Sequence, residues 1–355
     1  MTKLEKIRAA IRDRGIDGIL IYDELNQRYL CDFAFTDGAV FISERRAELI
    51  TDFRYYEMAL NKADKSFTVS TPSNISEFIS SIISEENIKI LGFEGDKVTY
   101  SDYQRLKSRF GGVELVDIGN MISDARQIKT DEEIAIIQRA QDITDRAFAD
   151  LLSVINYNMT EIEVAAELEY SMRKNGACGF AFDTISVSGA SSSLPHGVPG
   201  NEKLKRGFLT LDYGAKLDGY CSDMTRTIVI GKADDEMKRL YNTVLKAQRA
   251  ALDYISEGAD CGEADKISRD IIDSIPEYKG CFGHSLGHSV GLQVHEEPRL
   301  SRRSFGQKMR VGEIYTVEPG IYILGKYGCR IEDMIVIRSD GIHNFTKSGK
   351  DLIEI

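Results

Sequence analysis

Residues 211–231, LDYGAKLDGYCSDMTRTIVIG, contain two apolar runs on either side of a turn signal, and an acid stands in each run. Asp218 and the glycine after it are typical of a tight turn between two strands. A hairpin centred near Leu217 and Asp218 places Asp212 roughly opposite Asp223. Directly opposed side chains in a sheet lie about 4.5–5.5 Å apart, so two like charges there repel each other. The segment therefore predicts either a ligand that offsets this repulsion or a different register.

A second segment, residues 316–337, repeats the arrangement. TVEPGIYIL puts Glu318 in an apolar strand, RIEDMIVI puts Glu332 in the next, and Gly325 is the midpoint between the two acids. Each acid alone could be a turn, cap, strand-end or surface residue; Glu332, for example, could pair with Arg330. The four acids nevertheless share one local context, and buried carboxylates are costly unless they are paired or bind a metal. The two hairpins predict a site for divalent cations, two rather than one.

Four of the five histidines fall in two short segments: His196 in SSSLPHGVPG, and His284, His288 and His295 in GHSLGHSVGLQVHEEP. One imidazole with four carboxylates is a hard, oxygen-rich ligand set, which suits Mn²⁺, Co²⁺ or Fe²⁺ better than a closed structural zinc site. His284 and His288 have the spacing of a zincin helix, but the general-base glutamate of that motif is missing. A carboxylate-bridged metal pair activates water. The set therefore predicts metal-assisted hydrolysis.

Composition and charge narrow the class of protein. The chain has 355 residues, 42% of them hydrophobic, and its net charge of −11 argues against nucleic acid or an anionic membrane as a partner. The N-terminus is charged and amphipathic, and no window reaches the ~18–20 apolar residues of a membrane span, so we expect neither a signal peptide nor a span. Six scattered cysteines without a CxxC pair predict free thiols in a reducing cytoplasm.

Two domains are expected. Residues 1–126 alternate helix patterns (LEKIRAAIRDR, RYYEMALNKA, ISEFISSIISEE, SDYQRLKSRF) with strand patterns (DGILIYD, GAVFIS, AELITDF, IKILGFEG, GVELVD), which predicts a compact α/β domain. Thr130 with Glu133 is a capping-box pattern ahead of a long helix. A second domain, of α+β type, is therefore expected over residues 127–355, and it contains every candidate site residue.

In order along the chain, SLPHG, LDYGAKLDGYCSDMTRT, GHSLGHSVGLQVHE, VEPGIY and RIED are similar to the motifs of the pita-bread metallopeptidases. They most resemble those of short bacterial Xaa-Pro aminopeptidases and Xaa-Pro dipeptidases (prolidases). The resemblance covers nearly the whole chain, because that family also has an N-terminal α/β domain of creatinase/prolidase type. It implies two divalent metal ions, Mn²⁺ or else Co²⁺, with the following ligands: Asp212, Asp223, His288, Glu318 and Glu332.

The resemblance also implies a role for each reacting group. Asp223 and Glu332 would bridge the two metal ions. Glu318 would bind metal and act as the acid/base that shuttles protons for the bridging hydroxide. His196 and His295 would contact the substrate and stabilise the developing oxyanion, as preorganised donors do.

Further residues would act around these groups. His284 would line the substrate pocket, and Arg330 and Tyr322 match positions that orient metal ligands, with Arg330 also placed to bind substrate. The chain departs from the family pattern where Gln293 replaces an acid and Cys329 replaces a small residue. A thiol near the site would make the site sensitive to oxidation.

The function expected first is that of an Xaa-Pro aminopeptidase, an exopeptidase that releases the residue before proline. An Xaa-Pro dipeptidase restricted to dipeptides is the close alternative. A catalytically dead binding module on the same fold is a remote one, because every metal ligand is present. Arg299, in HEEPRLSRRS, would bind the C-terminal carboxylate of a dipeptide or else face solvent among other arginines. Proline specificity and a homodimeric state follow from the resemblance alone.

Overall fold

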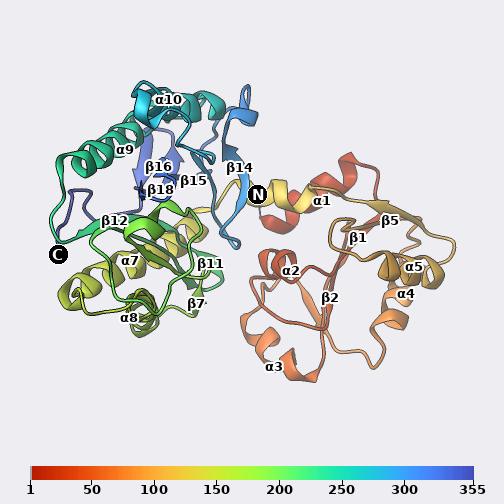
Figure 1. Ribbon diagram of the computed structural model, residues 1–355. Helices are drawn as coiled ribbons and strands as arrows, with labels where there is room; N and C mark the ends of the chain where they lie inside the picture. The colour runs from red at the N-terminus through yellow and green to blue at the C-terminus, as the bar shows by residue number, and fades with distance from the viewer. Residues whose placement is uncertain (1) are drawn as a thin grey trace. The chain divides into compact units, whose positions relative to one another are not determined.

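The computed structural model describes residues 2–355, and the chain forms two compact units, Met1–Arg126 and Gln127–Ile355. The first unit is of the expected α/β class (Figure 1). Its mixed sheet has the strand order β4-β3-β2-β1-β5-β6. The strands are β1 (Gly18–Ile21), β2 (Ala39–Ser43), β3 (Ala47–Ile50), β4 (Thr68–Ser70), β5 (Ile90–Phe93) and β6 (Glu114–Asp117).

The helices of this part of the chain are α1 (Lys3–Asp13), α2 (Glu24–Cys31), α3 (Phe53–Lys62), α4 (Ile75–Glu85), α5 (Tyr100–Arg109) and α6 (Met121–Gln127). The sequence patterns indicated four of them and missed α2 and α6, which have 8 and 7 residues. Asp23 accepts a hydrogen bond from the Asn26 N–H and caps α2. The acid that ends the apolar run DGILIYD therefore also begins a helix.

The second unit is an α+β fold in which strands run between two pairs of helices (Figure 1). The helices α7 (Asp131–Val154) and α8 (Glu161–Lys174) lie on one side, and α9 (Asp235–Tyr254) and α10 (Cys261–Asp273) on the other. One apolar core packs against each pair, so the strands between them are largely buried. Within residues 2–355, no helix is both long enough and apolar enough to cross a bilayer.

The strands of the second unit form several short ladders. Those around the site are β12-β9-β8, β15-β18-β19, β16-β17 and β13-β14, and the small ladder β11-β10-β7 extends the first hairpin. Their bounds are β7 (Gly179–Phe180), β8 (Ile185–Ser188), β9 (Gly207–Tyr213), β10 (Ala215–Leu217), β11 (Tyr220–Cys221), β12 (Met224–Ile230), β13 (Gly287–Ser289), β14 (Glu296–Leu300), β15 (Ile314–Val317), β16 (Gly320–Ile323), β17 (Tyr327–Arg330), β18 (Asp333–Arg338) and β19 (Gly341–Asn344).

The first hairpin has a different register from the one expected. In the β9–β12 ladder Asp212 lies opposite Thr225, not Asp223. The turn is centred on Asp218 and Gly219, whose φ angles of 46° and 84° suit an Asp-Gly turn between twisted strands. Because side chains alternate between faces, the two acids are diagonal neighbours on one face. The repulsion of directly opposed charges is avoided, and Asp212 faces a hydroxyl instead.

The second hairpin has the expected register. The β15–β18 and β16–β17 ladders follow one common register, which places Glu318 opposite Glu332 where the two ladders are interrupted. Gly325, in the turn, has a φ of 71°. The Glu332 N–H donates to the Thr225 carbonyl oxygen at 3.1 Å. This hydrogen bond joins the second hairpin to the first, close to the acids of both.

Candidate metal centre

A cavity of about 520 Å³ opens within the second unit. All the acids and the imidazole that the sequence indicated as metal ligands line this cavity. Four other predicted site residues line it as well: His196, His284, His295 and Arg330. The fold thus brings together residues that are spread over more than a hundred positions of the chain.

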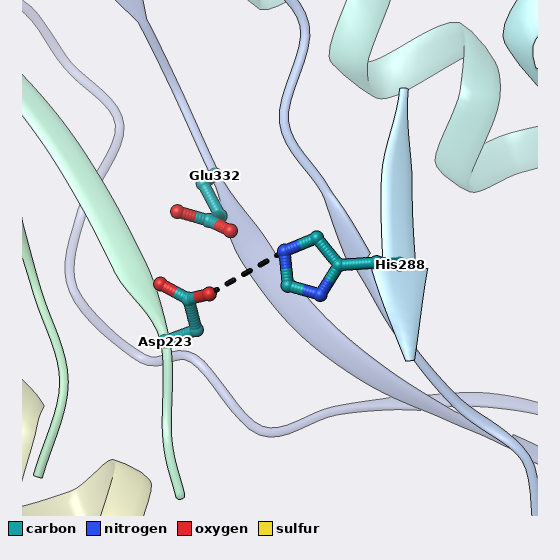
Figure 2. A group of neighbouring side chains, drawn as sticks. All are labelled: Asp223, His288 and Glu332. Atoms are coloured by element: carbon teal, nitrogen blue, oxygen red, sulfur yellow. Dashed lines mark ion pairs between the residues drawn. The ribbon is translucent and has the colours of Figure 1, made fainter. Parts of the chain in front are cut away.

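The tightest group in the cavity is Asp223, His288 and Glu332 (Figure 2). Each offers one ligand atom, and these atoms all lie within 4.8 Å of one another. Asp223 precedes β12, His288 is in β13, and Glu332 lies between β17 and β18, so three separate elements converge here. His288 Nε2 lies 3.7 Å from Asp223 Oδ2, and all three side chains are buried. One cation could contact all three.

The backbone around His288 determines how its ring is presented. A Cβ atom at Gly287 would lie 1.9 Å from the Thr316 carbonyl oxygen, so glycine is needed for β13 to approach β15 this closely. The His288 N–H donates to Thr316 Oγ1 at 3.1 Å, and His288 Nδ1 lies 3.1 Å from the Ser289 carbonyl oxygen. Because a carbonyl only accepts, Nδ1 carries a proton, and Nε2 is the atom that faces the acids.

The two remaining acids flank this group. Glu318 Oε1 lies 3.3 Å from His288 Nε2 and accepts a hydrogen bond from Thr316 Oγ1 at 3.1 Å. Asp212 Oδ2 accepts from the Arg330 guanidinium at 2.6 Å. Asp212 Oδ1 is buried and has no hydrogen-bond partner within residues 2–355. An unpaired buried oxygen is costly, and a bound cation would satisfy it.

Burial makes most of these acids hard to ionise without a counter-charge. It raises the pKa of Asp223 and of Glu332 well above the ordinary range, and the neighbouring acids raise both further. Burial would also raise the pKa of Glu318, but the hydrogen bond and charge of His288 outweigh it and hold that pKa at about 2. A bound divalent cation would displace the protons that the raised pKa values imply. The residues therefore fit a site for hard divalent ions.

A chain of hydrogen bonds leads away from Asp212. The Arg330 guanidinium that holds Asp212 also donates to the Tyr322 hydroxyl at 2.6 Å. That hydroxyl lies 3.0 Å from His284 Nε2, and His284 Nδ1 lies 2.9 Å from the Ser285 carbonyl oxygen. These contacts assign the proton to Nδ1 and make the Tyr322 hydroxyl the donor to Nε2. Burial lowers the pKa of His284, which favours the same neutral ring.

Three residues that hold the site in place were not predicted. Thr225 Oγ1 donates to Glu332 Oε2 at 2.7 Å and accepts from Arg330 Nε at 3.0 Å. Thr316 contacts both a histidine and an acid, as described above. Arg226, which is 2% exposed, donates to the Glu332 carbonyl oxygen at 2.5 Å. The correct centre of the Asp-Gly turn would have indicated Thr225, whereas no local pattern indicates the other two.

Three other predicted contacts lie on the open side of the cavity. His196 and His295 are exposed, and the ring of His295 lies 4.4 Å from that of His288. Arg299 lines the cavity too, with its Nε 3.1 Å from Glu297 Oε1. Arg299 is therefore placed to meet a ligand in the cavity, although its side chain is 45% exposed.

Two expectations about neighbouring residues change. Gln293 is exposed, and its backbone N–H donates to Glu296 Oε1 at 3.1 Å. Cys329 is fully buried in the core that packs against α9 and α10, and burial raises the pKa of its thiol to about 12. Burial and the raised pKa both oppose the expected oxidation of this thiol, because oxidation begins at an accessible thiolate. All six cysteines are free thiols.

Known proteins and family models resemble the chain over nearly its whole length. Residues 135–339 match the model for "Metallopeptidase family M24", and residues 3–128 match "Creatinase/Prolidase N-terminal domain". The solved Xaa-Pro dipeptidase from Bacillus anthracis is similar, with a TM-score of 0.95 and 44% identity over 99% of each chain. The X-Pro aminopeptidase from Thermotoga maritima has a TM-score of 0.92 and 35% identity, covering 98% of this chain and 100% of its own. An Xaa-Pro dipeptidase from Pyrococcus horikoshii is 38% identical over 99% of this chain and 98% of its own.

These likenesses confirm the expected fold. The first unit is an N-terminal domain of creatinase/prolidase type, and the second is a pita-bread domain. The residues that line the cavity all belong to the pita-bread domain. The candidate metal ligands therefore all come from one domain.

Proposed function

The chain belongs to metallopeptidase family M24, and from this membership we propose that it is an Xaa-Pro dipeptidase, a prolidase. It is a metallo-exopeptidase, and divalent metal ions belong to its site. The observation that carries the proposal is the single cavity that all the predicted ligands line beside three further histidines. Two of the three relatives described above are named dipeptidases. The aminopeptidase activity expected first from the sequence becomes the second candidate.

We propose that five residues hold two divalent ions, Mn²⁺ or else Co²⁺. Asp212, Asp223, His288, Glu318 and Glu332 would hold them. When bound, such ions act as Lewis acids and lower the pKa of a water molecule. The support is the hard, oxygen-rich donor set and the unpaired Asp212 Oδ1.

The other residues act on the substrate and on protons. Glu318, which lines the cavity beside His288, would accept a proton from the attacking water and pass it to the proline nitrogen as that bond breaks. Like any amide nitrogen, it has to receive a proton to leave as an amine. His196 and His295, on the open side, would donate to the carbonyl oxygen as it becomes negative.

Of two further residues, His284 keeps the role first expected and Arg330 does not. His284 lines the cavity with its ring held by Tyr322, so we propose that it shapes the pocket. Arg330 already donates to Asp212, to Tyr322 and to the Pro195 carbonyl oxygen. We therefore propose that Arg330 orients a metal ligand rather than binding substrate.

Arg299 is proposed to select dipeptides. Its guanidinium lines the cavity, and arginine matches the two oxygens of a carboxylate. In an Xaa-Pro dipeptide the proline carries the free C-terminal carboxylate, whereas in a longer peptide a further residue follows. A cation in the same cavity as the metal ligands would therefore favour the dipeptide.

The test compares Ala-Pro with Ala-Pro-Ala as substrates of Mn²⁺-loaded protein and follows alanine release. We expect cleavage of Ala-Pro and little of Ala-Pro-Ala. In Arg299→Gln, KM for Ala-Pro should rise about tenfold or more, the loss of a charge-assisted bond, while Arg303→Gln, an exposed neighbour, should leave it unchanged. Efficient cleavage of Ala-Pro-Ala would instead identify an aminopeptidase, as the Thermotoga relative is named. Failure on both peptides, with Co²⁺ as well, would contradict the catalytic proposal.

We propose that the protein is a cytoplasmic homodimer that takes proline-containing peptides and binds neither nucleic acid nor membrane. The family resemblance supports the dimer, the free thiols support a reducing compartment, and the net charge of −11 opposes nucleic acid. We place the domain boundary at residues 126 and 127. Sedimentation of the full chain tests the dimer, because a monomer and a dimer differ twofold in mass.

A further inference from the structure

Asp265 and Arg269 form a buried ion pair on α10, one helical turn apart. Arg269 Nε and NH2 donate to the two carboxylate oxygens of Asp265 at 3.0 and 2.9 Å. The Asp265 side chain is 0% exposed and that of Arg269 is 11% exposed. Neither Asp265 nor Arg269 is among the described residues, 2–355, that line the cavity. A buried pair is weak evidence for stability, because desolvation offsets much of the attraction, so its remaining contacts indicate its role.

Those remaining contacts are with the backbone of the segment that precedes β13. Arg269 NH1 donates to the Phe282 carbonyl oxygen at 2.6 Å, and NH2 donates to the His284 carbonyl oxygen at 2.8 Å. Asp265 Oδ1 accepts the Leu286 N–H at 2.9 Å. The guanidinium also stacks on the Phe282 ring at 4.2 Å. Two side chains of one helix thus hold every second residue of the segment, at Phe282, His284 and Leu286.

This segment reaches the site at two points. The Glu318 N–H donates to the Leu286 carbonyl oxygen at 2.8 Å, so the residue held by Asp265 in turn holds the backbone of Glu318. The His284 ring packs edge-on against Phe282, with centroids 5.0 Å apart, and contacts the Tyr322 hydroxyl. A displacement of the segment would therefore move the His284 ring and the Glu318 backbone together.

We propose that Asp265 and Arg269 are positioning residues of the catalytic site. From outside the cavity they set the segment that carries His284 and fixes the backbone of Glu318. The inference rests on the proposed function, because it assigns these two residues to the same site. The helix also carries an exposed pair of the same spacing, Lys266 and Asp270, with 50% and 64% exposed side chains. That pair provides a matched control on the same element.

The test compares Asp265→Asn and Arg269→Lys with Asp270→Asn in the full-length, metal-loaded protein. We expect the first two variants to lower kcat/KM for Ala-Pro ~10–100-fold, as the loss of residues that orient metal ligands usually does. Asp270→Asn should have no effect. Ile272→Val, a fully buried core change on α10, controls for lost stability and should keep the wild-type kcat/KM.

A second readout does not depend on activity. The chain has five histidines, so their ring resonances can be resolved by NMR of the metal-free protein, in which no paramagnetic ion broadens them, and loss of a peak in His284→Gln assigns that ring. We expect the His284 resonance to shift in Asp265→Asn and Arg269→Lys but not in Asp270→Asn. A folded variant with an unmoved resonance and wild-type kinetics would overturn the proposal. Wild-type protein that cleaves neither peptide would refute the proposed function, whereas the NMR comparison would still decide whether the pair sets this segment.

If both single variants fail to fold, the double variant Asp265→Leu, Arg269→Met replaces them. It removes both charges together, and replacing a buried pair by apolar side chains of similar volume is often tolerated. The same shift of the His284 resonance is expected in this variant. A folded double variant whose His284 resonance stays in place would contradict the assignment.

Discussion

The Arg330 guanidinium and Asp212 Oδ2 lie 2.6 Å apart, in a pair whose side chains are 4% and 14% exposed. One oxygen of Asp212 is thereby fixed, and the other is buried without a hydrogen bond within residues 2–355. The same guanidinium reaches Tyr322 and Thr225, so one planar side chain sets the directions of three groups around the site. A planar fork can do this, whereas a lysine ammonium on a flexible stem cannot.

Arg330→Lys is therefore expected to weaken the site although it keeps the charge. We expect metal affinity or kcat/KM to fall ~10–100-fold, as when other partners of metal ligands are removed. Metal content by mass spectrometry and kinetics with Ala-Pro measure the two effects separately. Arg338→Lys is the control, because Arg338 lies at the surface and pairs with the exposed Asp131. Equal behaviour of the two variants would show that the fork is not needed.

Glu332→Gln should remove metal rather than merely weaken catalysis. Glu332 is 1% exposed, belongs to the tightest group in the cavity and accepts from Thr225. An amide offers a neutral oxygen in place of a charged one, so a bridging role would be lost. We expect less metal per chain and a fall in kcat/KM of more than ~100-fold. That fall exceeds the usual effect of removing a residue that only hydrogen-bonds a metal ligand. Asp340→Asn, at an exposed acid nearby in sequence, should keep full metal content.

Metal removal should also lower thermal stability. A metal that binds only the folded chain, at a free concentration of ~100 times its Kd, stabilises the fold by about 2.7 kcal/mol. For a domain of this size that stabilisation raises the Tm by ~5–10 °C. We therefore expect chelation to lower the Tm by about that amount and added Mn²⁺ to restore it. In Glu332→Gln the difference should largely disappear. A chelator effect of the same size in both proteins would place the stabilising metal elsewhere.

Elements with strong periodicity could be predicted from the sequence. The long helix α7 and its capping box were recognised because capping and an apolar stripe are local signals. The short helices α2 and α6 were missed, since they have too few turns to show a period. The register of the first hairpin was wrong because the turn was placed one residue too early, and a turn shift moves every pairing across the ladder.

The candidate site was more predictable in its ligands than in their support. The acids and histidines fall in short motifs, and the fold brings them to one cavity. Their partners are contacts between distant residues: Arg226 reaches the Glu332 carbonyl oxygen, and Arg269 reaches the His284 carbonyl oxygen. No local pattern shows which carbonyl a buried arginine will meet. The gathering of these side chains in one cavity could therefore be predicted from the sequence, and the contacts that hold them could not.

Glu94 in the first unit gives a pH dependence that does not involve the metal site. Its side chain is buried, with Oε2 accepting the N–H groups of Tyr22 and Asp23 at 2.8 and 2.9 Å, and Oε1 accepting from Asn26 at 2.7 Å. Burial raises the pKa of Glu94, and these hydrogen bonds lower it again only in part. The folded protein therefore keeps the Glu94 proton to a higher pH than the unfolded chain does.

The sign of the effect follows from this difference. A group whose pKa is raised on folding contributes stability at low pH, and that contribution is lost as the pH rises through the folded-state pKa. Glu94→Gln cannot titrate, so the Tm of the wild type relative to this variant should fall as the pH rises from about 4 toward neutral. Scanning calorimetry over that range measures the slope, with Glu57→Gln, an exposed position on α3, as the control. The hydrogen bonds lost in Glu94→Gln shift its Tm at every pH alike, so the slope alone reports the titration. A Tm difference that stays constant would show that Glu94 ionises as easily in the folded protein as in the unfolded chain, and one that grows with pH would show that it ionises more easily there.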